Sequence, residues 1–157
     1  MKTIIYSPGD PAGIGPDIFL SLMHEGFFEY IKANVVCMGD KELFHLRSKE
    51  LGYSLEINSF SNINDINEKV GFLEIIKCHD ISSGILNSTN SEYVIENLDF
   101  AIDTCIKKMG FGLVTGPISK ENIVEGGYSF SGHTERIMQK TNSDNVLMLL
   151  ASERLKV

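Results

Sequence analysis

The sequence predicts an α/β fold, with a mostly parallel β-sheet covered by helices on both faces. Short apolar runs of strand length alternate with segments of helical periodicity along the 157 residues. The runs are apolar at successive positions, which is typical of strands buried on both faces of a parallel sheet. Hydrophobic residues make up 43% of the chain and charged residues 22%, the composition of an ordinary globular domain. Strands and helices in alternation therefore indicate a layered α/β/α architecture.

Five runs have the length and apolar content of strands. In chain order they are Thr3–Ser7, Asn34–Met38, Leu73–Cys78, Gly112–Thr115 and Val146–Leu150. Four segments between them repeat apolar residues every three or four positions, as helices do. These are Asp17–Ile31, Asp40–Leu51, Ser91–Met109 and Thr134–Lys140. The Asn-, Ser- and Asp-rich stretch Ser59–Glu68 predicts a loop.

The segment Ser91–Met109 is the clearest helix. Its apolar residues recur three and four positions apart along its whole length. Thr89 and Glu92 have the spacing of a T-x-x-E capping box, which starts such a helix. Gly110 is expected to end it.

The last residues predict a sheet that this chain leaves unfinished. Val146–Leu150 has the pattern of a buried strand, residues 152–154 that of a turn, and residues 155–157 that of a strand beginning. A domain usually ends in polar or tied-down residues. We therefore expect a chain that stops inside a sheet, with an uncovered edge.

Charge and cysteine content exclude several classes of protein. The formal charge of -7 excludes a basic nucleic-acid binder. No apolar run approaches the ~20 residues of a membrane span, and no secretory signal follows Met1, so we expect a cytoplasmic protein without a membrane partner. The three cysteines are odd in number and lie in apolar sequence, which indicates buried thiols rather than disulfides or a zinc knuckle: Cys37, Cys78 and Cys105.

The segment SPGDPAGIGPD, Ser7–Asp17, joins the first strand to a helix. Gly13 and Gly15 would allow positive φ and a close approach of a ligand to the backbone, and the helix start can face an anion. The spacing differs from G-x-G-x-x-G, and no phosphate-loop lysine follows. A tight strand-to-helix connection is the alternative interpretation.

The segments LVTGPISK and FSGHTER carry the other candidate site residues. Lys120 follows a buried strand, where open α/β sheets place ligands, and it could hold a phosphate or carboxylate by charge. A solvated lysine after a turn is the alternative. His133 and Thr134 stand at an expected helix start, where a histidine can donate to an anionic or hydroxylated substrate; the alternative is a capping cluster. The other histidines have no partner at metal-ligand spacing: His24, His45 and His79.

Together the three segments resemble the 4-hydroxythreonine-4-phosphate dehydrogenase family of pyridoxal phosphate biosynthesis. The motifs are GDPAGIGPD at Gly9–Asp17, LVTGPISK at Leu113–Lys120 and FSGHTE at Phe130–Glu135, in the family's order and spacing. Ser119 departs from the Asn that often precedes the lysine in the family. The resemblance runs from Met1 to Val157 but covers only half of the family's length, so we expect an N-terminal fragment.

The resemblance implies an NAD- or NADP-linked oxidation of 4-phosphooxy-L-threonine at its C3 hydroxyl. Decarboxylation of the product then gives 3-amino-2-oxopropyl phosphate. In the family a divalent metal, zinc, magnesium or cobalt, polarises that hydroxyl. Its three histidine ligands and most cofactor contacts are expected after Val157, so no histidine of this chain is assigned to the metal.

The family's substrate-binding His-Thr pair matches His133 and Thr134. Four further residues stand at matching motif positions, and their chemistry makes them candidate contacts for the substrate or its phosphate: Lys120, Asp10, Gly13 and Gly15. No catalytic residue is assigned. The substrate partner implied is a phosphorylated hydroxy amino acid.

The implied fold is that of the isocitrate and isopropylmalate dehydrogenases, with two α/β/α domains per chain and a homodimer. Residues 1–120 would form most of the first domain, which the C-terminal end of the family's chain completes, and residues 121–157 would begin the second. We expect this chain alone to be inactive, and poorly soluble or oligomeric. Two alternatives are a non-catalytic half that works with a separately encoded partner half, and a related dehydrogenase of phosphoerythronate or phosphothreonate.

Overall fold

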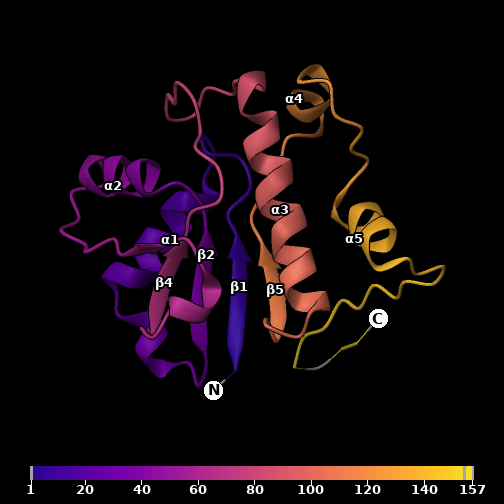
Figure 1. Ribbon diagram of the computed structural model, residues 1–157, viewed down its shortest axis with the longest axis horizontal. Helices are drawn as coiled ribbons and strands as arrows, with labels where there is room; N and C mark the ends of the chain where they lie inside the picture. The colour runs from indigo at the N-terminus through magenta and orange to yellow at the C-terminus, as the bar shows by residue number, and fades with distance from the viewer. Residues whose placement is uncertain (1, 154, 157) are drawn as a thin grey trace.

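The computed structural model describes residues 2–153 and 155–156 as an α/β fold around one parallel sheet (Figure 1). The strand order is β3-β4-β2-β1-β5, with every neighbouring pair parallel. The strands are β1 (Thr3–Ser7), β2 (Asn34–Met38), β3 (Ser59–Phe60), β4 (Val70–Leu73) and β5 (Gly112–Thr115). The α-helices are α1 (Gly15–His24), α2 (Lys41–Glu50), α3 (Ser91–Ile106), α4 (Lys120–Glu125) and α5 (His133–Thr141), and the 3₁₀ helices are η1 (Phe27–Tyr30), η2 (Ile63–Asp65) and η3 (Ser88–Asn90). The predicted α/β class is confirmed.

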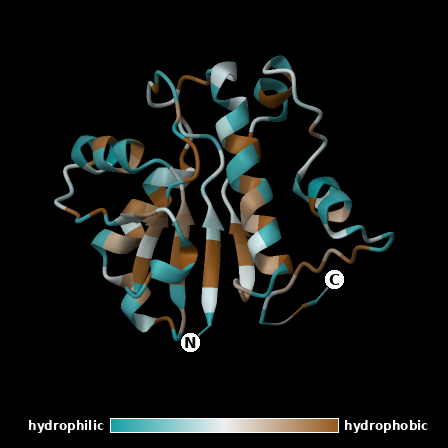
Figure 2. Cartoon of the chain, in the orientation of Figure 1, coloured by the Kyte–Doolittle hydropathy of each residue, from teal (hydrophilic) through white to brown (hydrophobic). Residues whose placement is uncertain are grey.

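Helices cover both faces of the sheet, as predicted. On one face, Phe19 of α1 stacks on Tyr6 of β1 with ring centroids 5.1 Å apart and meets Phe44 of α2 edge-on. On the other face, Ala101 of α3 packs with Ile5 of β1 and with residues of β2 and β4. Successive residues of a strand point to opposite faces, so the all-apolar runs supply both cores. In Figure 2 the strands are coloured mostly as hydrophobic, whereas the helices carry both hydrophilic and hydrophobic residues.

Of the five predicted strands, three have the predicted bounds and two do not. The runs at residues 3–7, 34–38 and 112–115 are β1, β2 and β5. The prediction of a strand at Leu73–Cys78 is wrong, because β4 is Val70–Leu73 and pairs with β2 along that length. After Leu73 the Glu74 side chain turns to the start of α2, where it accepts a hydrogen bond of 3.0 Å from the Lys41 N–H. β3, inside the predicted loop, was not anticipated because it has only two residues.

The apolar run Val146–Leu150 is not a strand in the described chain, which contradicts its prediction. Its side chains are 45–84% exposed, and Figure 2 shows it as an apolar stretch beside the sheet. β5 is an edge strand, and no described segment pairs with its free side. A strand needs a partner for its backbone groups as well as apolar side chains. Beside the predicted turn, the Ser152 N–H donates to the Leu155 carbonyl at 2.7 Å, while Arg154 and Val157 lie outside the described residues.

The first helix is shorter than predicted. α1 ends at His24 instead of continuing to Ile31, and η1 follows after a turn. Gly26 has a φ of 68°, a left-handed conformation that stops the helix. A glycine within a periodic pattern is therefore the signal that marks this end.

The predicted caps of the long helix are wrong, although the helix itself is present. Thr89 and Glu92 form no capping box; the Asn87 side chain instead accepts from the Thr89 N–H at 3.1 Å and caps η3, which runs directly into α3. At the other end α3 stops at Ile106, before Gly110, and Lys108 takes the left-handed conformation with a φ of 59°. None of the helices in the described residues is long and apolar enough to cross a membrane.

Candidate functional site

Two loops that contain glycine and proline contact each other at the carboxyl ends of β1 and β5, near α4 (Figure 1). They are residues 8–14, between β1 and α1, and residues 116–119, between β5 and α4. The Asp10 N–H donates to the Pro117 carbonyl at 3.1 Å. A Cβ added to Gly9 would lie 2.2 Å from that carbonyl oxygen, and one added to Gly116 would lie 2.1 Å from the Pro8 carbonyl oxygen. Glycine permits this approach of two backbones because it has no Cβ. Two motifs far apart in the sequence therefore form one unit.

Gly13 and Gly15 pack against their own loop. They do not use the positive φ that glycine allows, because only Gly9 among the glycines of this loop has it, at 80°. A Cβ on Gly15 would lie 1.8 Å from the Pro8 carbonyl oxygen, and one on Gly13 3.2 Å from the Asp10 carbonyl oxygen. The chain's own backbone fills the space that we expected a ligand to use. A ligand contact at either glycine stays a prediction.

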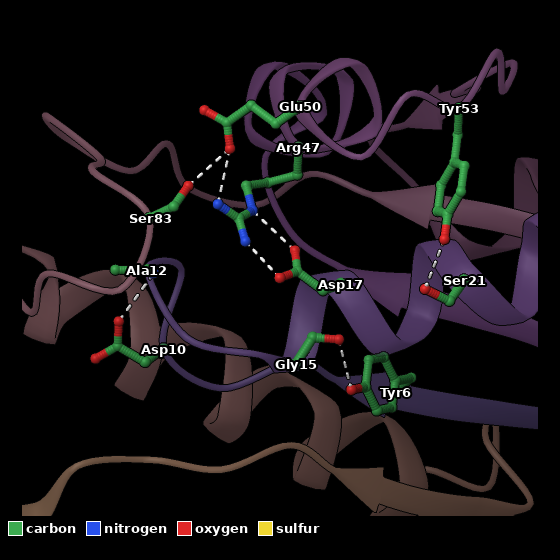
Figure 3. Close-up of polar contacts among 10 residues, drawn as sticks. All are labelled: Tyr6, Asp10, Ala12, Gly15, Asp17, Ser21, Arg47, Glu50, Tyr53 and Ser83. Atoms are coloured by element: carbon green, nitrogen blue, oxygen red, sulfur yellow. Dashed lines mark hydrogen bonds and ion pairs between the residues drawn. The ribbon is translucent and has the colours of Figure 1, made fainter.

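Asp10 braces the loop from inside. It is buried, and its Oδ1 accepts from the Ala12 N–H at 3.0 Å (Figure 3). Its Oδ2 accepts from Asn122 Nδ2 at 3.4 Å, which joins the first loop to α4. Burial raises the pKa of this carboxyl, although both hydrogen bonds act in the opposite direction. In this position Asp10 supports the site from behind, and its role as a substrate contact stays a prediction.

A buried arginine fixes the start of α1 (Figure 3). Arg47 of α2 donates through Nε and Nη2 to the two carboxylate oxygens of Asp17, and through Nη1 to Glu50 at 2.8 Å. Ser83 donates to the same Glu50 carboxylate at 2.7 Å. The network joins α1, α2 and the loop before α3. The sequence analysis did not identify it, because its members lie far apart in the chain and have no motif spacing.

Lys120 stands at the start of α4 with its side chain exposed. Ser119 caps this helix, since its hydroxyl accepts from the Asn122 N–H at 3.3 Å, so a serine at this position retains a capping function. Lys120 Nζ lies 3.7 Å from the point where a Cβ on Gly132 would stand, and a Glu135 carboxylate oxygen lies 2.7 Å from the same point. The GPISK and FSGHTE motifs therefore meet in space, as a shared site requires.

His133 is the first residue of α5 and is partly buried. Its ring meets Phe130 edge-on, with centroids 5.9 Å apart. Its Nε2 is shielded from solvent and has no hydrogen-bond partner in the described part of the chain. Burial and the nearby Lys120 ammonium lower the pKa of the imidazole, which favours its neutral form. A shielded, unpaired nitrogen costs free energy, and a hydrogen bond from a ligand would remove that cost.

The predicted site residues thus fall into two groups. Lys120, His133 and Thr134 gather around the start of α5, where no side chain caps the helix N-terminus. Asp10, Gly13 and Gly15 lie behind, connected to that group through Asn122. Asn122, which makes this connection, was not predicted as a site residue. It is buried in α4, and no local sequence pattern marks it, because its neighbours in the helix include charged residues.

The remaining histidines and cysteines do not add to this group. His24 stacks on Tyr53 with centroids 4.2 Å apart, far along α1 from the loops. All three cysteines are free; Cys37 is buried, the other two partly so, and burial raises the pKa of each thiol. Within residues 2–153 and 155–156, no three His, Cys, Asp or Glu side chains come together as a metal ion requires. The described residues therefore do not fit the divalent metal that the resemblance implies.

Three backbone donors of the two loops are not available to the pyrophosphate of a dinucleotide. Such a group needs free backbone N–H donors in a glycine loop. Here the N–H groups of Asp10, Gly13 and Gly116 donate to the carbonyls of Pro117, Asp10 and Ser7, at 2.7–3.1 Å. Their donors are used within the protein.

A parallel sheet with polar motifs gathered beyond its carboxyl edge is the arrangement in which open α/β folds bind small ligands. The family model of the pyridoxal phosphate biosynthetic protein PdxA matches residues 31–157. The chain belongs to this PdxA family. Its relatives carry the name of a dehydrogenase.

Individual relatives and solved structures agree with this assignment. The 4-hydroxythreonine-4-phosphate dehydrogenases of Sodalis glossinidius and Pseudoalteromonas atlantica are each 35% identical to this chain, over 99% and 96% of it. It spans only 47% and 46% of those proteins, about half their length. Crystal structures of the enzymes named likewise from Burkholderia phymatum and Klebsiella pneumoniae match the fold with TM-scores of 0.86 and 0.85, at 21% and 22% identity. Each covers 99% of this chain, which covers 48% and 49% of theirs.

Proposed function

We propose that this chain is the N-terminal, substrate-binding half of a 4-hydroxythreonine-4-phosphate dehydrogenase that uses NAD(P) and a divalent metal. In the proposed reaction the C3 hydroxyl of 4-phosphooxy-L-threonine is oxidised to a ketone, with its hydride passing to NAD(P)⁺ and its proton to the medium. The resulting β-keto acid loses carbon dioxide and takes up a proton, giving 3-amino-2-oxopropyl phosphate. The observation that carries the proposal is the unpaired His133 imidazole beside the Lys120 ammonium.

The chemistry of this group suits a small phosphorylated hydroxy acid. Lys120 offers a positive charge to a phosphate or carboxylate oxygen. The neutral His133 ring can exchange one hydrogen bond with an oxygen of the substrate, and the Thr134 hydroxyl can exchange another. The uncapped start of α5 adds positive potential at the same place. These residues bind and orient the substrate.

We place the metal and most NAD(P) contacts in the part of the relatives that this chain does not match, because the described residues form no metal cluster and three N–H donors of the glycine loops are already used. We also propose that the complete enzyme is a homodimer, and a cytoplasmic location stays a prediction from the sequence. If the second half of the enzyme is instead a separately encoded partner, we place the metal and the NAD(P) contacts in that partner and the substrate contacts in this chain.

We further propose the domain plan of the isocitrate and isopropylmalate dehydrogenases, with a boundary near residue 120. The described sheet ends with β5, and the described residues after it add α4 and α5 but no further strand of the sheet. Beside β5 lies an apolar groove of about 240 Å³, lined by residues such as Ile18, Phe27 and the half-exposed Val114. An uncovered edge strand with an apolar groove is the surface that the rest of a first domain would cover.

Binding of the substrate to this chain tests the proposal. Titration of 4-phosphooxy-L-threonine into ¹⁵N-labelled protein should give saturable shifts of the His133 and Thr134 amides. His133→Gln and Lys120→Met should each weaken binding by about tenfold, the effect of losing a hydrogen bond to a charged group. Lys77→Met, which removes an exposed lysine from its ion pair with Glu42, is the matched control and should bind as the wild type does.

The competing ligands decide between the alternatives. L-Threonine and inorganic phosphate should each bind more weakly than the complete substrate. Tighter binding of 4-phosphoerythronate would assign the chain to the related dehydrogenases instead. Absence of saturable shifts with all of these ligands, or equal binding by His133→Gln and Lys120→Met, would contradict the proposed site.

A further inference from the structure

The helix that carries His133 and Thr134 has little apolar anchorage. α5 contains no buried residue within its nine positions. Ile137 is its only described side chain packed against the main core, and it is only partly buried. In contrast α3, on which α5 lies (Figure 1), contributes nine buried residues. Apolar packing therefore fixes α3 firmly to the sheet but holds α5 only weakly.

Ion pairs between α3 and α5 supply the missing anchorage. Arg136 donates to both carboxylate oxygens of Asp99, from Nε at 2.7 Å and from Nη2 at 2.6 Å. One turn further along both helices, Lys140 Nζ lies 2.9 Å from Asp103 and 3.7 Å from Asp99. The two cations on α5 therefore pair with the two carboxylates on α3 at two successive turns of the helices.

The Asp99–Arg136 pair has the geometry of a strong ion pair. Its side chains are only 18% and 23% exposed, and the guanidinium fork meets both oxygens. Bidentate pairs fix orientation as well as distance, whereas exposed single contacts stabilise little. The Asp99 hydrogen bond is the main reason that the pKa of Arg136 is raised.

The same helix α3 also positions Lys120. The Ser91 hydroxyl at the start of α3 donates to the Asn122 carbonyl of α4 at 3.0 Å. α3 is therefore a common platform, with α4 and Lys120 attached at one end and α5 attached through Asp99. The distance between Lys120 and His133 depends on both attachments.

We infer that Asp99 and Arg136 are positioning residues that hold His133 and Thr134 beside Lys120. Arg136 lies three residues after His133, within one turn of the same helix, so the pair acts close to the site. Neither residue belongs to the group that we propose to touch the substrate. The role in substrate binding rests on the proposed function, but the position of His133 can be measured without any ligand.

The test uses the 157-residue chain and follows the His133 ring by NMR, with His133→Gln to assign its signals. In the wild type the ring packs edge-on against Phe130 with the Lys120 ammonium nearby, and its titration midpoint should lie below the ordinary 6.5. Asp99→Asn should release α5, expose the ring to water, and move the midpoint up towards that value. Asp99→Glu, which keeps a carboxylate for Arg136, should restore most of the wild-type midpoint. Lys77→Met is the control with an ion pair removed elsewhere.

Affinity provides the second measurement. By calorimetry, Asp99→Asn should bind 4-phosphooxy-L-threonine about fivefold more weakly than the wild type, while Asp99→Glu stays close to it. An Asp99→Asn protein that remains folded by circular dichroism and keeps the wild-type His133 midpoint would overturn the inference. A shifted midpoint in a chain whose wild type binds no substrate would support the positioning role and contradict the proposed function, so the two failures differ.

Discussion

The Asp10 carboxylate accepts a hydrogen bond of 3.4 Å from the Asn122 side chain, although 112 positions separate the two residues. This contact joins the loop after β1 to the helix after β5. Asp10 also holds the Ala12 N–H, and Asn122 also accepts from Ser91 of α3 through its carbonyl. The buried pair thus connects the two loops to the helix that supports the proposed substrate group.

Asp10→Asn should change how stability depends on pH. Burial raises the pKa of Asp10 above its ordinary 3.8, so the folded chain binds this proton more tightly than the unfolded chain. The stability that results is complete below 3.8 and is lost as the pH rises through the raised value. Urea unfolding at several pH values should therefore show that the variant becomes more stable relative to the wild type as the pH rises above 3.8. If the stabilities of the variant and the wild type changed with pH in the same way, the pKa of Asp10 would not be raised in the folded chain.

Gly15→Ala should destabilise the fold by about 3 kcal/mol or more, because its Cβ would meet the Pro8 carbonyl oxygen at 1.8 Å and that oxygen belongs to backbone. Gly112→Ala is the matched control, since nothing lies within 4 Å of a Cβ at that position of β5. Its effect should stay within about 1 kcal/mol of zero. Chemical denaturation of both variants measures the difference, and equal stabilities would show that the Pro8 loop yields easily.

Arg47→Met should cost about 3 kcal/mol at neutral pH. The substitution keeps most of the apolar stem but leaves the Asp17 and Glu50 carboxylates without their shared cation. Asp17 is a quarter exposed, so water moderates the loss. Lys77→Met removes an exposed pair and should leave the unfolding midpoint unchanged. If Arg47→Met left the free energy of unfolding unchanged, packing of α1 and α2, and not the ion pair, would position the loop after β1.

The chain alone should show no turnover of 4-phosphooxy-L-threonine with NAD or NADP and zinc, magnesium or cobalt. The described residues offer no metal cluster, and the N–H groups of Asp10, Gly13 and Gly116 in the glycine loops already donate within the protein. Formation of reduced nicotinamide, followed at its absorbance band, is the measurement. Sustained NAD(P)H formation by this chain, absent from a mock purification and from His133→Gln, would contradict the proposal that the metal and NAD(P) contacts lie outside this chain.

Local patterns in the sequence were sufficient for much of the fold. The bounds of β1, β2 and β5 follow from short apolar runs, and Asp40 marks the start of α2 because its side chain caps the helix through the Glu42 N–H at 2.8 Å. Lys120 and His133 were identifiable as candidates because each follows a glycine turn within a motif. These features depend on a residue and its near neighbours, which the sequence records directly.

Other features depend on what a residue meets from far along the chain. Val146–Leu150 has the composition of a buried strand, yet no described strand pairs with it. Gly15 is required by the Pro8 carbonyl, and Asp99 is paired with an arginine 37 positions away. Strand pairing, close backbone contact and ion pairing all require two partners, and sequence distance carries no information about which partners the folded chain brings together. The residues of the proposed site could therefore be identified individually from the sequence. Their common position at the start of α5 follows from the packing of α3, α4 and α5.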